Sequence, residues 1–230
     1  MRKNIKMLAV VTLVVVMAIA LVACEYKNLD TTYNQEKRTK MENFTHLNES
    51  AQHGQAVMIG DSIVELYNVQ EQFAGMEKIV YNRGISGDTS DRMLERISNA
   101  LDIEPTTLFV LVGTNDIGRG IPREDTLTNV RNVILKAKES GVENIVIESV
   151  YPVNHHLNKR MVGGRQNSDI IEYNKRLKAL TEELSVIYVD LFSVLKGEDG
   201  EFKRELTYDG LHPNEHGYDV ITSVLKGYIR

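Results

Sequence analysis

Short apolar runs that alternate with helical stretches constrain the fold of this chain more than any other feature. Runs typical of buried strands occur at Ala56–Ile59, Lys78–Tyr81, Leu108–Val112, Asn144–Val150 and Val186–Val189. Stretches with helical character lie near residues 90–102, 122–140, 168–184 and 214–229. Strands that alternate with helices in this way form βαβ units, in which helices cover both faces of a parallel sheet. The sequence therefore predicts one α/β domain, a three-layer α/β/α sandwich.

The amino terminus has the form of an export signal. Basic residues at positions 2, 3 and 6 precede an almost purely apolar stretch from Met7 to Ala23, which is the usual pattern of a secretory signal. The stretch ends in Leu-Val-Ala-Cys24, which resembles the lipobox of bacterial lipoproteins, and Cys24 is the only cysteine. The resemblance implies that Cys24 becomes a lipid-modified amino terminus. The alternative is an uncleaved membrane helix, for which this stretch is at the short end of the roughly 17–25 residues required.

These features divide the chain into three parts and limit its partners. We expect a lipoprotein signal peptide at 1–23, an anchor cysteine with tether and amphipathic helix at 24–50, and the α/β domain at 51–230. On either interpretation of the amino terminus, the domain lies outside the cytoplasm, attached to the membrane. The formal charge of −5 becomes more negative once the basic signal residues are removed. An acidic body without a basic cluster argues against a nucleic-acid partner.

Ser62 directly follows the first predicted strand, in the segment Gly60-Asp61-Ser62-Ile63. Ligand sites in open α/β sheets collect at the carboxyl ends of the strands, so a serine there is placed to act as a nucleophile. Serines at such positions usually satisfy only a turn. The role of Ser62 therefore depends on whether a base, a group that orients the base, and oxyanion donors occur elsewhere.

The carboxyl-terminal region offers the base and its orienting group in Asp209-Gly210-Leu211-His212-Pro213. Asp209 and His212 are three residues apart, in a loop that Pro213 turns into a helix, so both side chains can face one cleft. His212 would then reach the serine, and the Asp209 carboxylate would hold the imidazole in the required tautomer. The alternative for His212 is a helix-capping or surface role. His216 is a rival base that we expect to face outward.

Candidate oxyanion donors follow the second and third predicted strands. Asn115, in Gly113-Thr114-Asn115-Asp116, offers a neutral side-chain amide at the same edge of the sheet as Ser62. Gly84 and Gly87 lie in the segment that follows the second strand. Glycine lets the backbone approach a ligand closely and present its N–H. Each segment alone is ordinary loop chemistry.

Together, these four segments resemble the conserved blocks of the SGNH hydrolases, also called GDSL esterases and lipases, across roughly residues 40–230. The resemblance implies a flavodoxin-like sandwich with a five-stranded parallel sheet. It also implies that Ser62 is the nucleophile, His212 the general base and then acid, and Asp209 the orienting carboxylate. The oxyanion hole would consist of the backbone N–H groups of Ser62 and Gly87 and the side chain of Asn115. It implies no metal and no organic cofactor. The one departure is isoleucine at position 63, where the GDSL name has leucine.

The resemblance leaves the substrate and two other interpretations open. Similarity of residues 82–89 to the acetylhydrolase-like branch suggests short acyl esters, such as O-acetyl groups on carbohydrate or lipid; lysophospholipase or acyl-thioesterase activity is the alternative. A protein of another class, a catalytically inactive surface-anchored binding protein, could use the same scaffold. The α/β-hydrolase elbow G-x-S-x-G is not matched, because Val64 stands two residues after the serine.

The stretch from Tyr151 to Asn167 is the longest without a predicted element. Loops of more than about 12–15 residues without structure of their own are often lids or binding segments. We expect it either to line the substrate pocket or to be a mobile surface loop. Its His155-His156 pair is a poor metal-ligand set without further ligating partners, so no metal site is expected there.

Overall fold

The computed structural model describes Met17 and residues 35–229. The predicted signal segment, apart from Met17, and the predicted anchor Cys24 lie outside the described residues. A helix covers residues 35–48, and its residues from Phe44 onward belong to the compact unit that carries the sheet. Among the described helices, none combines the length and the apolar character needed to cross a membrane.

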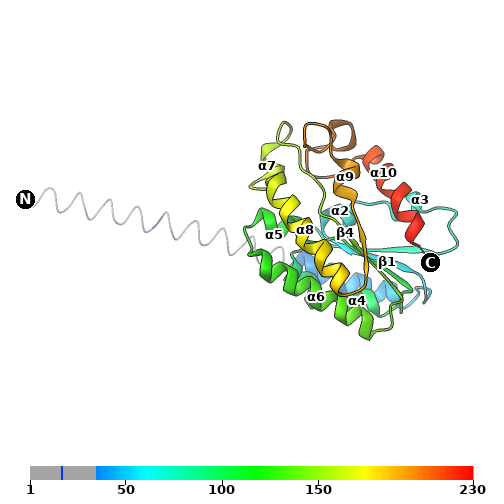
Figure 1. Cartoon of the computed structure of the whole chain (residues 1–230). Helices are drawn as coiled ribbons and strands as arrows, with labels where there is room; N and C mark the ends of the chain where they lie inside the picture. The colour runs from blue at the N-terminus through cyan, green and yellow to red at the C-terminus, as the bar shows by residue number, and fades with distance from the viewer. Residues whose placement is uncertain (1–16, 18–34, 230) are drawn as a thin grey trace, which may run out of the picture. The chain divides into compact units, whose positions relative to one another are not determined.

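The sheet has five parallel strands in the order β2-β1-β3-β4-β5. Figure 1 labels two of them, β1 and β4, among the surrounding helices. The strands are β1 (Ala56–Gly60), β2 (Val80–Gly84), β3 (Thr107–Val110), β4 (Asn144–Glu148) and β5 (Ile187–Val189). This strand order and the all-parallel pairing confirm the predicted flavodoxin-like α/β fold.

Four longer helices occupy the predicted helical stretches: α4 (Ser90–Leu101), α6 (Arg123–Glu139), α8 (Asn167–Glu183) and α10 (Glu215–Leu225). The shorter helices are α2 (Ser62–Glu65), α3 (Val69–Gln72), α5 (Thr114–Gly118), α7 (Lys159–Val162) and α9 (Leu191–Leu195), with 3-10 turns η1 (Arg204–Leu206) and η2 (Lys226–Tyr228). The predicted last helix is therefore shorter than 214–229, because the chain tightens into η2 after Leu225.

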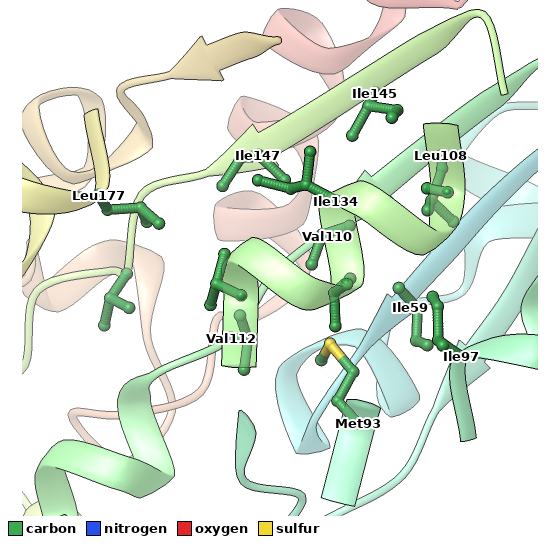
Figure 2. Close-up of a cluster of buried hydrophobic side chains, with 14 of the residues drawn as sticks. Ile59, Met93, Ile97, Leu108, Val110, Val112, Ile134, Ile145, Ile147 and Leu177 are labelled. Carbon is green, nitrogen blue, oxygen red and sulfur yellow. The ribbon is translucent and has the colours of Figure 1, made fainter. Parts of the chain in front are cut away.

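Alternate strand residues supply two separate cores, one on each face of the sheet. One core packs strand residues such as Ile59, Val110 and Ile147 against α4, α6 and α8, which contribute Ile97, Ile134 and Leu177 (Figure 2). The other packs Met58, Phe109 and Val146 against α9 and α10, which contribute Leu191 and Ile221. Side chains on a strand point alternately to opposite faces, so this division explains why apolar residues occur at both alternating sets of strand positions.

The predicted second strand is wrong in its boundaries. The sequence suggested Lys78–Tyr81, but β2 extends to Gly84 through the polar pair Asn82-Arg83. Arg83 is only 3% exposed. Its guanidinium lies over the rings of Phe44 and Tyr81, 5.1 and 5.6 Å from their centroids. Aromatic contacts thus allow a charged side chain to continue a strand where the sequence predicts its end.

The strand order places the topological switch point of the sheet at the carboxyl ends of β1 and β3. The chain passes from β1 to β2 on one side and then returns to β3 on the other, so the order reverses beside β1. Ligands bind at such switch points in open α/β sheets. Ser62 follows β1 and Asn115 lies in the first turn after β3. The fold therefore brings both residues to the same edge.

Candidate active site

Ser62 is the first residue of α2, which packs directly onto the ends of β1 and β2. Gly60 and Gly84 are paired across these strands. A Cβ on Gly60 would lie 2.2 Å from Val64 Cγ2, and a Cβ on Gly84 would lie 2.2 Å from the backbone N of Glu65. Only glycine at both positions lets the helix approach this closely. Gly84, one of the two candidate glycines of its segment, therefore serves the close packing of α2.

The structure brings Ser62, His212 and Asp209 into one chain of hydrogen bonds. Ser62 Oγ lies 2.9 Å from His212 Nε2, and His212 Nδ1 lies 2.8 Å from Asp209 Oδ2. An ionised carboxylate can only accept, so the imidazole proton belongs on Nδ1. Nε2 is then free to accept the serine hydroxyl proton. This is the arrangement that a general base next to a nucleophile requires.

The Asp209 carboxylate is held ionised by local hydrogen bonds. Burial tends to raise its pKa, but the backbone N–H and the imidazole of His212 and the N–H of Leu211 outweigh that effect and lower it. Asp209 Oδ1 accepts both N–H groups, at 2.9 Å from Leu211 and 2.8 Å from His212. The same carboxylate therefore folds the loop and orients the imidazole.

The loop around Asp209 is fixed by its neighbours. Gly210 has φ +89°, and a Cβ there would lie 2.5 Å from the carbonyl oxygen of Asn154. Thr207 Oγ1 donates to the His212 carbonyl at 2.7 Å and accepts the Gly210 N–H at 3.0 Å. Tyr218 on α10 donates its hydroxyl to a backbone carbonyl of α2 at 2.8 Å. These contacts join the histidine segment to the serine segment.

Three N–H groups are available at the candidate oxyanion site. Within the described residues, the backbone N–H groups of Ser62 and Gly87 donate no hydrogen bond. Gly87 has φ +76°, the left-handed region that favours glycine. Asn115 Nδ2 donates to the Asp88 carbonyl at 2.9 Å, which leaves the second hydrogen of that amide available.

A buried ion pair holds the loop that carries Gly87. Arg96 Nε donates to Asp88 Oδ2 at 2.5 Å, and both side chains are almost fully buried. The same guanidinium also donates to backbone carbonyls at the ends of β2 and β1, at 2.8 and 2.9 Å. Arg96 thus ties the loop after β2 to the two strands beneath Ser62.

Two buried carboxyl groups near the site were not predicted. Burial raises the pKa of Asp61 to about 6, against the lowering effect of the Ile63 N–H and of the charges of His212 and Arg165. Burial likewise raises the pKa of Glu148, at the end of β4, to about 7, and the charge of Asp61 adds to this. Asp61 Oδ1 accepts the Ile63 N–H at 2.9 Å and so caps α2. A glutamate at the end of a strand gives no sequence signal of its burial.

The stretch from Tyr151 to Asn167 is more ordered than predicted. It contains the single turn α7, whose N-terminus is capped by the side chain of Asn158. His155 Nδ1 lies 2.8 Å from Glu201 Oε2, and its Nε2 lies 2.9 Å from the Arg165 carbonyl oxygen. Side-chain contacts far along the chain impose this order, so local sequence could not reveal it. The described residues hold no cluster of three or more metal-ligating His, Cys, Asp or Glu side chains.

Two further predictions concern the surroundings of the site. Five residues of this stretch line an open cavity of about 630 Å³: His155, His156, Lys159, Val162 and Gly163. The stretch itself contacts the histidine segment, because the Asn158 N–H donates to the Asp209 carbonyl at 3.2 Å. His216, the rival base, has a side chain that is 81% exposed, so it faces outward as expected.

The hydrogen-bonded serine, histidine and aspartate have the arrangement that hydrolases of the serine type use. Comparison with known proteins identifies the family: residues 58–220 match the GDSL-like lipase/acylhydrolase family. The chain belongs to this family of carboxylic ester hydrolases, as the sequence blocks predicted.

Individual relatives of the chain carry several different names. A solved structure from Streptococcus pneumonia, provisionally assigned as a platelet activating factor, has 32% identity and a TM-score of 0.83, covering 90% of this chain and 98% of its own. N-acylneuraminate cytidylyltransferase of Escherichia coli is 28% identical over 209 residues, 89% of this chain and 45% of that protein. Thioesterase 1/protease 1/lysophospholipase L1 of Escherichia coli is 27% identical over 144 residues, 62% of each. The chain spans less than half the length of the cytidylyltransferases that it matches.

Proposed function

We propose that the protein is a serine esterase that hydrolyses carboxylic esters through Ser62, His212 and Asp209. The observation that carries the proposal is the continuous hydrogen-bond chain from Ser62 Oγ through the imidazole to the Asp209 carboxylate. Family membership supports the same class of reaction.

The proposed reaction proceeds in two halves. Ser62 Oγ attacks the ester carbonyl carbon while His212 Nε2 accepts the hydroxyl proton, and the carbonyl electrons move onto the oxygen. The resulting oxyanion is stabilised by the N–H groups of Ser62, Gly87 and Asn115. The imidazolium then gives its proton to the departing alcohol, which leaves an acyl-enzyme. Water, deprotonated by His212, attacks that ester, and the acid leaves as Ser62 recovers its proton.

The expected substrates are short-chain acyl esters, such as O-acetyl groups of carbohydrate or lipid. One relative is named N-acylneuraminate cytidylyltransferase, and another is named thioesterase 1/protease 1/lysophospholipase L1. A second candidate is therefore hydrolysis of lysophospholipids or acyl thioesters. A series of p-nitrophenyl esters from acetyl to palmitoyl separates the two: a steep fall in kcat/KM beyond butyryl supports deacylation of short esters, and a rise supports lipid substrates.

Substitution of the triad tests the proposal directly. Ser62→Ala should abolish p-nitrophenyl acetate hydrolysis above the uncatalysed rate, and His212→Ala should do nearly the same. Ser50→Ala, at an exposed serine on the same domain, is the matched control and should retain full activity. Because His212 must be neutral to act as base, kcat/KM should fall in acid. Wild-type activity no higher than the uncatalysed rate would support the alternative, an inactive binding protein, and equal hydrolysis by Ser62→Ala and wild type would show that Ser62 is not the nucleophile.

We also propose that the protein is an extracytoplasmic lipoprotein, attached to the membrane through acyl chains on Cys24. The basic start, the apolar stretch and the single cysteine at the end of the lipobox-like segment support this proposal. The partners would be the membrane and a small-molecule, polysaccharide or lipid ester, and the acidic charge argues against nucleic acid.

A further inference from the structure

The guanidinium of Arg165, between α7 and α8, is buried beside the candidate oxyanion site. Arg165 is 8% exposed. Its Nη2 donates to Asn115 Oδ1 at 3.0 Å, its Nε to the Thr114 carbonyl at 2.9 Å, and its Nη1 to the Val162 carbonyl at 3.0 Å. In the described part of the chain, no carboxylate lies within ion-pair distance of this guanidinium. A buried arginine bound only by neutral oxygens is costly, so its position needs an explanation.

The surrounding residues are shaped to hold this side chain. A Cβ on Gly118, the last residue of α5, would lie 2.6 Å from Arg165 Cζ. Glycine at this position therefore leaves room for the guanidinium against α5. The backbone of Arg165 is fixed as well, since its carbonyl oxygen lies 2.9 Å from His155 Nε2. Arg165 thus has a fixed position, and its side chain joins the loop 151–167 to the segment that carries Asn115.

The contacts of Asn115 permit only one orientation of its amide. Arg165 carries donors and no acceptor, so it requires the oxygen of the amide on its side. The Asp88 carbonyl accepts only, so it requires the nitrogen, and it receives Nδ2 at 2.9 Å. A flipped amide would lose both hydrogen bonds and turn its oxygen toward the developing oxyanion. A cationic donor on Oδ1 also polarises the amide, which makes the remaining N–H a stronger donor.

We propose that Arg165 is the positioning residue for the oxyanion donor Asn115, whose amide it orients and polarises for the transition state. The inference rests on the proposed esterase function. It also assigns the loop 151–167 a part in catalysis, because this loop places the buried guanidinium of Arg165 against the side chain of Asn115, which would complete the oxyanion hole.

A double-mutant cycle on the full-length protein tests this proposal. Arg165→Met keeps the apolar stem and removes the donors, and Asn115→Ala removes the oxyanion donor; the cycle also includes the variant with both changes. The assay is p-nitrophenyl acetate hydrolysis, with kcat and KM determined separately and folding checked by thermal denaturation. The matched control is Arg83→Met, which truncates another buried arginine, 3% exposed, that donates to Asn48 Oδ1.

We expect Arg165→Met to lower kcat only when Asn115 is present. Asn115→Ala should lower kcat by about 10²–10³-fold, as removal of one oxyanion donor does elsewhere. Arg165→Met should lower kcat by roughly 10–100-fold with little change in KM, and the double variant should match Asn115→Ala to within about threefold. Arg83→Met should lower the melting temperature and leave kcat unchanged. Multiplicative losses in the double variant, or wild-type kcat in Arg165→Met, would overturn the proposal.

Two further measurements keep the result interpretable. If Arg165→Met does not fold, Arg165→Lys retains the charge and most of the stem; a kcat defect that disappears in the Asn115→Ala background supports the proposal, and one that persists there overturns it. Ser62→Ala is assayed in parallel. If Ser62→Ala is as active as wild type, the proposed hydrolysis through Ser62 fails and this inference with it. If Ser62→Ala is inactive and Arg165→Met is normal, only the role of Arg165 fails.

Discussion

Replacement of Glu148 by glutamine should make the free energy of unfolding of the protein less sensitive to rising pH. Glu148 is 1% exposed, and its Oε2 accepts the hydroxyl of Tyr151 at 2.6 Å. Its Oε1 has no hydrogen-bond partner among the described residues. Burial, with a further contribution from the charge of Asp61, raises the pKa of this carboxyl from 4.5 to about 7. The native state therefore holds a proton that the unfolded chain releases at lower pH.

The sign and size of the effect follow from linkage. Between pH 4.5 and 7 the unfolded state binds fewer protons than the native state at this position, so stability falls as the pH rises. The stabilisation is complete below pH 4.5 and is lost above pH 7. Each unit of pKa difference corresponds to about 1.4 kcal/mol, so the loss amounts to about 3 kcal/mol. Glutamine does not titrate, and its oxygen can still accept the Tyr151 hydroxyl.

Urea denaturation of wild type and Glu148→Gln at pH 4.5, 6 and 8 measures this difference. The free energy of unfolding of the variant, relative to wild type, should increase by about 3 kcal/mol from the lowest to the highest pH. Glu143→Gln, at an exposed carboxyl next to the start of β4, is the control and should show no such trend. A difference between Glu148→Gln and wild type that stays constant with pH would refute the reasoning.

Three other substitutions give separate tests. Arg96→Leu should lower the free energy of unfolding by about 3–5 kcal/mol in urea denaturation, because it removes the cation that pairs with the buried Asp88 carboxylate; a loss below about 1 kcal/mol would contradict this account of the ion pair. Phe109→Ala, at a fully buried position in the core beside α10, should cost about 3–5 kcal/mol and lower the melting temperature without changing KM. Cys24→Ser should move the protein from the membrane fraction to the soluble fraction after cell lysis, and full retention in the membrane would argue for an uncleaved helix.

The sequence was sufficient for the parts of the fold that local patterns encode. The apolar runs and the helical stretches between them predicted the three layers of the α/β/α sandwich. The spacing of Asp209 and His212 indicated that both could face one cleft, and the structure places them next to Ser62. The sequence reveals these features because each depends on residues that are close together in the chain or on the position of a residue directly after a strand.

Contacts between distant residues account for what the sequence did not reveal. Arg83 continues β2 only because Phe44 and Tyr81 flank its guanidinium. The stretch from Tyr151 to Asn167 is ordered because Glu201 binds His155. The burial of Glu148 depends on the layers packed over β4. No local pattern reports these partners, so the sequence alone could not reveal the contacts.

Covalent labelling of the full-length protein in detergent tests the central claim most directly. Incubation with a fluorophosphonate, followed by peptide mass spectrometry, reports which side chain has become a nucleophile. The account predicts one adduct per chain, located on Ser62, with none on the Ser62→Ala variant and slow labelling of His212→Ala. Labelling of Ser62→Ala at the wild-type rate, or an adduct on another residue of the wild-type protein, would contradict it.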